Sequence, residues 1–516
     1  MTGNNLPSLD EEGVLSAAEE KFERLRRLTG LWLGPLLFVL LLLFPVHGIS
    51  PEASRLAAIL SLTLVWWMCE PVPIPVTAVL APALCVILNI APAKEIFASF
   101  GDPIVFLFIG GFILAEAMMV HGLDRRIALG LLGLKWVGNS VARVIFVFGA
   151  IATCLSMWLS NTATTAMLAP IALGIISEMR EMLNRQATPS SHSDQMKLAS
   201  GLMLILAYGA SVGGIATPIG TPPNLIGIGM IRQQLHMDIS FLHWMLFAVP
   251  STLVMFGVLY ILIYFMYRPA HSRIEGLKEY LSERKAGLGK LNRGQANTLF
   301  AFLTAVVLWV LPGILALLPG AQFKSWADSY QKLMPEGVVA VIAASLLFLL
   351  PVNFKKLEFT MKWQQATRID WGTILLFGGG IALGKLAFST GLAGSLGKSI
   401  LMGTGVSGSG MITLLAIVLG VIISETTSNT ASATMVIPVA ISVAQAAGIN
   451  PLAPALGACL GSSFGFMLPV STPPNAIVYG TGFVPITKMV KTGLIFDIIG
   501  IGVIWATVML GAQYLK

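Results

Sequence analysis

The chain has 516 residues, of which 55% are hydrophobic and only 11% are charged. Because soluble domains carry about 25% charged residues, this composition excludes a soluble globular protein. The net charge of +7 would suit a nucleic-acid-binding protein. Basic cytoplasmic loops produce the same excess in a membrane protein, so we expect no nucleic-acid partner.

The N-terminal segment 1–29 is expected to be a cytoplasmic tail. Its first 20 residues are polar and acidic. They lack the basic region that begins a cleaved signal peptide, so the first span is expected to be retained. The four cysteines lie in apolar runs without CxxC spacing. This pattern indicates neither a disulfide framework nor a zinc site.

The apolar runs predict an all-α polytopic membrane protein, because a bilayer is crossed by about 20 apolar helical residues. Ordinary spans are predicted near residues 31–49, 53–71, 74–92, 103–121, 241–267, 296–318, 335–351, 371–390 and 489–512.

Four further apolar segments are interrupted by Ser, Asn, Thr, Gly and Pro, which an uninterrupted helix would not use there. We expect segments 141–177 and 410–447 to be re-entrant helical hairpins. Segments 198–231 and 452–482 are expected to be broken spans. The fold then has about 11 transmembrane helices plus the two hairpins.

The distribution of basic residues indicates the orientation. With the N-terminus in the cytoplasm, 24 Lys and Arg residues lie inside and seven lie outside, and the C-terminus is expected outside. The chain is then divided into a first half at 30–267, a cytoplasmic basic linker at 268–295 and a second half at 296–516.

Two motifs occur once in each half. The sequence SNTA at 160–163 recurs at 428–431, an offset of 268 residues, and TPPN at 221–224 recurs at 472–475. An odd number of predicted crossings separates the two SNT motifs, which places the halves in opposite orientations. Such inverted-topology repeats are typical of secondary transporters.

The motifs provide groups that bind small ions. Helix N-termini at breaks in the membrane attract oxyanions, while the carbonyls at helix C-termini suit Na⁺. The side chains of Asn161 and Asn429 offer an amide N–H to an anion and an amide oxygen to a cation. Neither motif contains Arg, Lys or His, so bound sodium is the expected counter-charge for an anionic substrate.

Three charged residues lie within or beside these segments. Glu425 precedes the second SNT motif by three residues and would favour a cation or act as a buried hydrogen-bonded group. Glu116 and Lys385 lie in predicted spans beside Gly-Gly sequences. We expect these two to be structural ion-pair or scaffold residues.

The repeated motifs resemble those of the divalent anion/sodium symporter family. The resemblance is carried by both SNT motifs, by IGTPPN at 219–224, by LPVSTPPN at 468–475 and by SETTSNTAS at 424–432. It implies a homodimer in which a scaffold domain holds a transport domain that moves as an elevator. It also implies Na⁺ as the coupling ion, with no organic cofactor.

The resemblance implies roles for particular residues. The sodium ligands would be Ser156, Ser160, Asn161 and Gly220 in the first half, and Ser424, Thr427, Asn429 and Ser471 in the second. The substrate carboxylates would contact Ser160, Asn161, Thr162, Thr221, Pro222, Ser428, Asn429, Thr430, Thr472 and Pro473.

The expected function is sodium-coupled symport of a four-carbon dicarboxylate (succinate, malate or fumarate) across a bacterial inner membrane. A sodium-independent anion exchanger and a symporter for citrate or sulfate share these motifs and remain alternatives. An anion channel is a weaker one, since broken helices also line pores. An enzyme is not expected, because no Ser-His-Asp, HExxH or P-loop pattern occurs.

Overall fold

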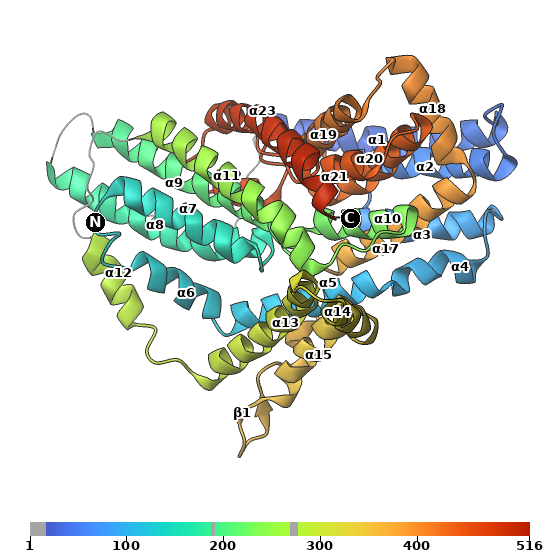
Figure 1. Ribbon diagram of the computed structural model, residues 1–516. Coiled ribbons are helices and arrows are strands. Elements are labelled where there is room, and N and C mark those ends of the chain that lie inside the picture. Colours follow the sequence, from blue (N-terminus) through green and yellow to red (C-terminus); the bar gives the residue numbers. More distant parts are fainter. Residues whose placement is uncertain (1–16, 187–190, 269–276, 516) are drawn as a thin grey trace.

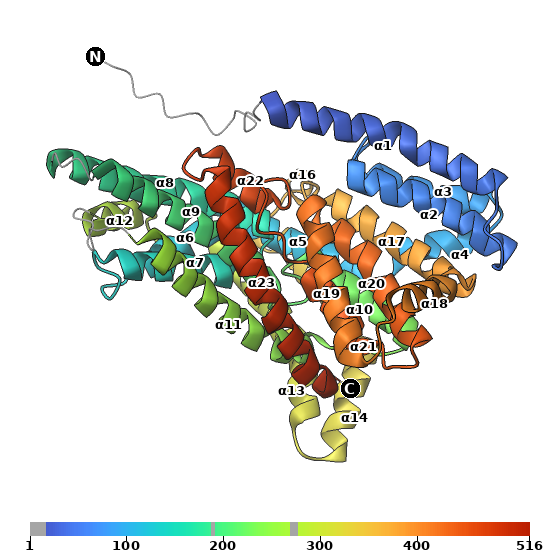
Figure 2. The same ribbon diagram turned by 90° about the horizontal axis from the view of Figure 1, so that it is seen from above.

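The computed structural model describes residues 17–186, 191–268 and 277–515. Within these ranges the chain is helical apart from one short two-stranded hairpin, so the prediction of an all-α polytopic fold is confirmed (Figures 1 and 2). Residues 1–16, which belong to the predicted tail, and residues 269–276 of the predicted linker lie outside the described ranges.

The first half begins with helices at the four predicted spans and with three short elements that were not predicted. They are α1 (Ala17–Leu43), α2 (Pro51–Cys69), α3 (Ile74–Ile87), α4 (Ala93–Phe97), the 3-10 turn η1 (Ala98–Gly101), α5 (Pro103–Val120) and α6 (Leu123–Leu132). Of these, α1, α2, α3 and α5 lie at the predicted spans, whereas α4, η1 and α6 were not predicted. The chain then forms α7 (Val141–Ser156), α8 (Asn161–Gln186), α9 (Ser191–Gly214), α10 (Pro222–Leu235) and α11 (Phe241–Tyr267).

The second half repeats this order after α12 (Leu277–Ala286). Its elements are α13 (Arg293–Leu317), α14 (Ala321–Leu333), α15 (Glu336–Leu349), β1 (Pro351–Asn353), β2 (Glu358–Phe359), α16 (Trp363–Ala366), α17 (Trp371–Ser389) and α18 (Leu392–Thr404). They are followed by α19 (Ser409–Thr426), α20 (Asn429–Ala446), α21 (Leu452–Gly461), α22 (Pro473–Gly480), α23 (Ile486–Gly511) and the turn η2 (Ala512–Leu515).

Within the described ranges, nine helices are long and apolar enough to cross a bilayer. Two predicted spans form shorter helices instead, α3 and α15, each of 14 residues. α15 continues from α14 across a 62° bend at Pro335, since proline cannot continue the hydrogen-bond ladder of α14. Helix α1 also begins at Ala17, inside the segment predicted as a tail, where helix-forming Ala, Glu, Lys and Arg are frequent.

The glycine sequences of α5 and α17 allow helices to pack closely. A Cβ added to Gly110 of α5 would overlap Ala340 of α15, and one added to Gly379 of α17 would overlap the backbone of Ala78 in α3. Each half thus packs its glycine-containing helix against a short apolar helix, as small residues permit in membrane proteins.

The two hairpin segments and two broken segments lie together. α7, α8, α9 and α11 run side by side, while α19, α20 and α21 form a second group that is packed on α10 (Figure 1). α11 and α23 contact each other between these groups. α1, α2 and α3 lie at the opposite end of the molecule from α8 and α12 (Figure 2).

Candidate functional site

The first SNT motif lies where a hairpin turns. α7 ends at Ser156 and α8 begins at Asn161, so the chain reverses over four residues. The hydroxyl of Ser160 accepts a hydrogen bond from the backbone N–H of Ala163 at 3.2 Å, which is the usual cap of a helix N-terminus. The hydroxyl of Ser156 donates to Oδ1 of Asn161 at 2.7 Å. We call residues 160–162 the first tip.

The second SNT motif reproduces this geometry. α19 ends at Thr426 and α20 begins at Asn429. The hydroxyl of Ser428 accepts from the N–H of Ala431 at 3.2 Å, and that of Ser424 donates to Oδ1 of Asn429 at 2.7 Å. We call residues 428–430 the second tip. The sequence repeat is therefore a repeat of hydrogen bonds as well.

Each TPPN motif starts a new helix after a break in a broken segment. The first break is residues 215–221, between α9 and α10, and the second is residues 462–472, between α21 and α22. In both, Thr occupies the N-cap and the two prolines occupy the first helical positions, where no backbone N–H is required.

The asparagine that ends each TPPN motif holds the break together. The amide of Asn224 donates to the carbonyls of Gly214 and Thr217 at 2.9 and 2.7 Å. The amide of Asn475 donates to the carbonyls of Gly465 and Leu468 at 2.9 and 3.0 Å. These bonds satisfy carbonyls that the interrupted helices leave unpaired. Sequence reasoning missed this role, although the doubled Asn after Pro-Pro was a signal for it.

In each half the tip lies against the break. A Cβ added to Gly220 would lie 3.0 Å from the carbonyl oxygen of Met157, beside the first tip. A Cβ added to Gly465 would lie 3.1 Å from the hydroxyl of Ser424 and 3.2 Å from Cβ of Ser471. A Cβ at Gly220 would also lie 2.5 Å from the carbonyl oxygen of Gly214, so a larger residue there requires a shift of the backbone, and one at Gly465 requires its neighbours to move slightly. The structure thus brings together the sodium ligands that the resemblance implies for each half.

The halves also interlock. α10 packs against α20 and α21 of the second half, and α22 packs against α8 and α9 of the first. The thiol of Cys459 in α21 lies 3.1 Å from the carbonyl oxygen of Pro223 in the first TPPN motif. Each hairpin therefore contacts the helix that follows the break of the other half.

The implied ligands differ in their exposure. The residues assigned to sodium alone are buried: Ser156, Gly220, Ser424, Thr427 and Ser471. Those assigned to substrate at the tips are more accessible: Ser160, Asn161, Ser428, Asn429 and Thr430 are half-buried, and Thr162 is exposed. Thr221 and Thr472 are buried, whereas Pro222 is half-buried and Pro473 is exposed.

Each half also gathers helix ends of both polarities. The N-termini of α8, α10, α20 and α22 lie at the tips and breaks, as do the C-termini of α7, α9, α19 and α21. N-termini stabilise negative charge and C-termini stabilise positive charge. In the described part of the chain, no group of three or more His, Cys, Asp or Glu side chains is arranged to hold a metal ion.

Two of the three charged residues singled out above have identifiable partners. Glu425 is buried, and its carboxylate accepts from the N–H groups of Met467 and Leu468 at 2.8 and 3.3 Å. Lys385 lies 3.5 Å from the carboxylate of Glu95, and both side chains are half-exposed. Lys385 thus forms an ion pair, as expected, but with Glu95 rather than Glu116.

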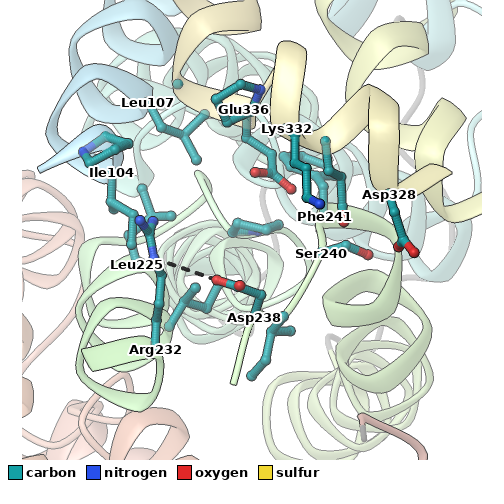
Figure 3. Close-up of a pocket in the computed structure, with 17 residues that line it drawn as sticks. Ile104, Leu107, Leu225, Arg232, Asp238, Ser240, Phe241, Asp328, Lys332 and Glu336 are labelled. Atoms are coloured by element: carbon teal, nitrogen blue, oxygen red, sulfur yellow. Dashed lines mark ion pairs between the residues drawn. The ribbon is translucent and has the colours of Figure 1, made fainter. Parts of the chain in front are cut away.

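A pocket adjoins the first break without containing any of the predicted site residues. It lies between α10 and α11 on one side and α14 and α15 on the other (Figure 3). Arg232 and Asp238 form an ion pair of 3.4 Å within it, and Glu336 and Lys332 face them across the pocket (Figure 3).

Comparisons with known proteins agree on one class. Residues 26–515 match the family model described as "Sodium:sulfate symporter transmembrane region". The chain is 35% identical over 489 residues to the sodium-dependent dicarboxylate transporter SdcS of Staphylococcus saprophyticus, covering 94% of this chain and 91% of that protein. It is 33% identical over 476 residues to SdcS of Staphylococcus aureus, covering 92% and 89%.

A solved structure shares the fold. The YdaH transporter of Alcanivorax borkumensis superimposes with a TM-score of 0.52, covering 94% of this chain and 97% of that chain. The sequence identity is 14%, so the likeness concerns the fold alone.

Proposed function

Because the chain belongs to the sodium:sulfate symporter transmembrane family, we propose that this multi-pass membrane transporter couples sodium entry to the uptake of a four-carbon dicarboxylate. The expected substrates are succinate, malate and fumarate. The relatives named above are sodium-dependent dicarboxylate transporters, which supports this substrate class over citrate or sulfate.

The observation that carries the proposal is the repeated Ser-to-Asn hydrogen bond. In each half a fully buried serine directs its hydroxyl at Oδ1 of the tip asparagine, at 2.7 Å. Ser156 and Ser424 lie at helix C-termini, where carbonyl oxygens converge. Hydroxyl, amide and carbonyl oxygens together suit Na⁺. We assign one sodium site to each half, with Gly220 in the first and Thr427 and Ser471 in the second.

The tip asparagines link the cation to the substrate. With Oδ1 directed at the buried serine, the amide nitrogen of Asn161 remains available to donate. That of Asn429 makes one long hydrogen bond to the carbonyl of Ser463, at 3.5 Å, and keeps a second N–H for the substrate. Each tip also presents a helix N-terminus whose free N–H groups favour a carboxylate. We assign one carboxylate of the dianion to each tip and its neighbouring TPPN motif.

Charge explains why sodium and substrate would bind together. A dianion at a tip has no motif cation to offset the loss of its hydration, and an uncompensated charge inside a membrane protein is costly. Sodium bound to the buried ligands of each half supplies that compensation. A sodium-independent exchanger lacks it, and for this reason symport is favoured.

The interlocked helices form the proposed moving unit. The hairpins and broken segments contact each other across the halves, so they are expected to move as one body against the remaining helices. We propose that this movement is an elevator and that the scaffold forms a homodimer in the bacterial inner membrane, with the N-terminus in the cytoplasm and the C-terminus outside.

Ligand-dependent thermal stability of the purified protein tests the proposal. In sodium buffer, succinate is expected to raise the melting temperature, because ligands that bind only the folded state stabilise it. In potassium buffer, succinate is expected to have no effect. Equal stabilisation by succinate in both buffers would support an exchanger instead. Stabilisation by sulfate or citrate, but not by succinate, would show that the transported anion is not a four-carbon dicarboxylate.

A further inference from the structure

A second carboxylate lies beside Glu425 and is not explained by the repeated sites. Asp497 lies in the middle of α23, and only 2% of it is exposed. Neither of its carboxylate oxygens receives a hydrogen bond of normal geometry. The carboxyl group of Glu425 lies within hydrogen-bonding reach of the carboxyl group of Asp497.

The carboxyl group of Glu425 already has hydrogen-bond partners in the second half. In addition to two backbone N–H groups, it accepts from the hydroxyl of Ser471 at 2.7 Å. The neighbouring hydroxyl of Tyr208 does not serve either acid, because it donates to the carbonyl of Phe466 at 2.6 Å. The backbone N–H of Phe466 lies near the carboxylate of Asp497, but no described donor forms a hydrogen bond of normal geometry with either of its oxygens.

No fixed cation compensates the two acids. Among the described residues, neither Glu425 nor Asp497 forms an ion pair. Two adjacent carboxylates in a buried site repel each other, and an unpaired buried charge is strongly destabilising. Either Asp497 is a neutral acid that donates to Glu425, or a bound cation lies between them.

The pair is absent from the first half. The residue 268 positions before Glu425 is Met157, and α11, which occupies the place of α23 in the first half, contains no acidic residue. The pair is thus not a duplicate of the two tip sites. It adjoins the second one, since Ser471 contacts Glu425.

We propose that Glu425 and Asp497 bind a third sodium ion, which rests on the proposed symport function. Carboxylate oxygens are favourable ligands for hard cations such as Na⁺. Sodium at this position neutralises the charge of the acid pair beside the second tip. Its binding orders the second break, because Glu425 contacts Met467, Leu468 and Ser471 within or beside it.

A third sodium ion gives the transport cycle a net charge. Three sodium ions and one dianion carry one positive charge inward, so the membrane potential drives uptake. With two sodium ions the cycle is electroneutral, and the potential does not act on it. The energy concerned is about 2.3 kcal/mol per charge per 100 mV.

Asp497→Asn separates the two explanations of the acid pair. Asparagine keeps the size of aspartate and donates an amide N–H to Glu425, so it replaces a neutral acid, but it removes the negative charge that would hold the third sodium ion. The matched control is Asp124→Asn in α6, where another buried carboxylate accepts from a backbone N–H at 2.7 Å.

The experiment measures the direction of succinate flux in proteoliposomes at set voltages and fixed sodium and succinate gradients. For wild type and Asp124→Asn, a tenfold change in the succinate ratio is expected to shift the balancing voltage by about 59 mV, the value for one net charge. For Asp497→Asn, voltage is expected no longer to reverse the flux. If Asp497→Asn does not transport, equilibrium binding of ²²Na⁺ to the purified variant tests the site instead. The variant is expected to bind one sodium ion fewer than the wild type.

Electroneutral wild-type transport, or unchanged voltage dependence and sodium binding in Asp497→Asn, would overturn the third site. These results leave the proposed symport intact. Succinate flux that ignores sodium altogether would instead contradict the proposed function.

Discussion

The hydroxyl of Ser424 donates to Oδ1 of Asn429 at 2.7 Å, and Ser156 makes the same bond to Asn161 in the first half. A buried serine thus fixes the orientation of each tip asparagine. With the amide oxygen directed inward to the cation ligands, each amide nitrogen keeps at least one N–H for the substrate, since that of Asn429 makes a single long bond to the carbonyl of Ser463.

Asn429→Ala tests this shared use of one amide. We expect the apparent affinities for sodium and for succinate both to fall by about tenfold or more, as loss of a ligand worth about 1.4 kcal/mol predicts. Substrate and sodium titrations of uptake measure both. Asn297→Ala removes an amide that bonds the carbonyl of Pro351 in another region, so it should change neither affinity. A fall in only one affinity in Asn429→Ala would contradict the shared ligand.

Asn224→Asp and Asn475→Asp test the hydrogen bonds that these asparagines donate to the carbonyls of the two breaks. Aspartate has the shape of asparagine but cannot donate to the break carbonyls, and each buried unsatisfied group costs about 1–3 kcal/mol. We expect lower melting temperatures and little transport. Asn450→Asp is the control, because Asn450 accepts from the N–H of Leu452 through its oxygen, a role that aspartate retains. If both break variants were as stable as the wild type, these hydrogen bonds would not be needed for the stability of the fold.

Gly213→Ala tests the close packing of the first hairpin on α9. A Cβ at this position would overlap the backbone of Thr153 in α7, and overpacking typically costs about 1–3 kcal/mol. We expect a lower melting temperature and loss of sodium-dependent uptake. Gly257→Ala in α11 meets no atom within 4 Å and should be neutral or slightly stabilising. Normal uptake by Gly213→Ala would show that this contact is not maintained during transport.

Lys385→Ala tests whether the intramembrane lysine acts in transport. Its ion pair with Glu95 is half-exposed, and such pairs contribute about 0–1 kcal/mol. We expect uptake kinetics within about twofold of wild type and a small change in melting temperature. A large loss of succinate affinity, with the fold intact, would instead make Lys385 a substrate residue.

Local sequence patterns predicted much of the fold and of the tips. The positions of the hairpins and breaks follow from proline, glycine and polar residues within apolar runs, because these residues cannot continue a helix in lipid. The caps at Ser160 and Ser428 follow from the same local rules. The helix starting at Ala17 was missed because hydropathy marks only the part of a helix that is apolar.

Contacts between distant segments could not be predicted in this way. Packing of α10 on α20 joins residues about 200 positions apart, and no single-chain pattern specifies it. The approach of Asp497 to Glu425 was likewise invisible, since α23 reads as an ordinary apolar span with one acid. The inward role of Asn224 was also missed, because the sequence does not show which carbonyls a break leaves unpaired.

Succinate uptake into proteoliposomes under separate gradients tests the central claim most directly. We predict that an inward sodium gradient drives accumulation of radiolabelled succinate into vesicles without internal succinate, and that a potassium gradient does not. Uptake that requires internal dicarboxylate and is unaffected by the sodium gradient would contradict sodium-coupled symport and identify the protein as an exchanger.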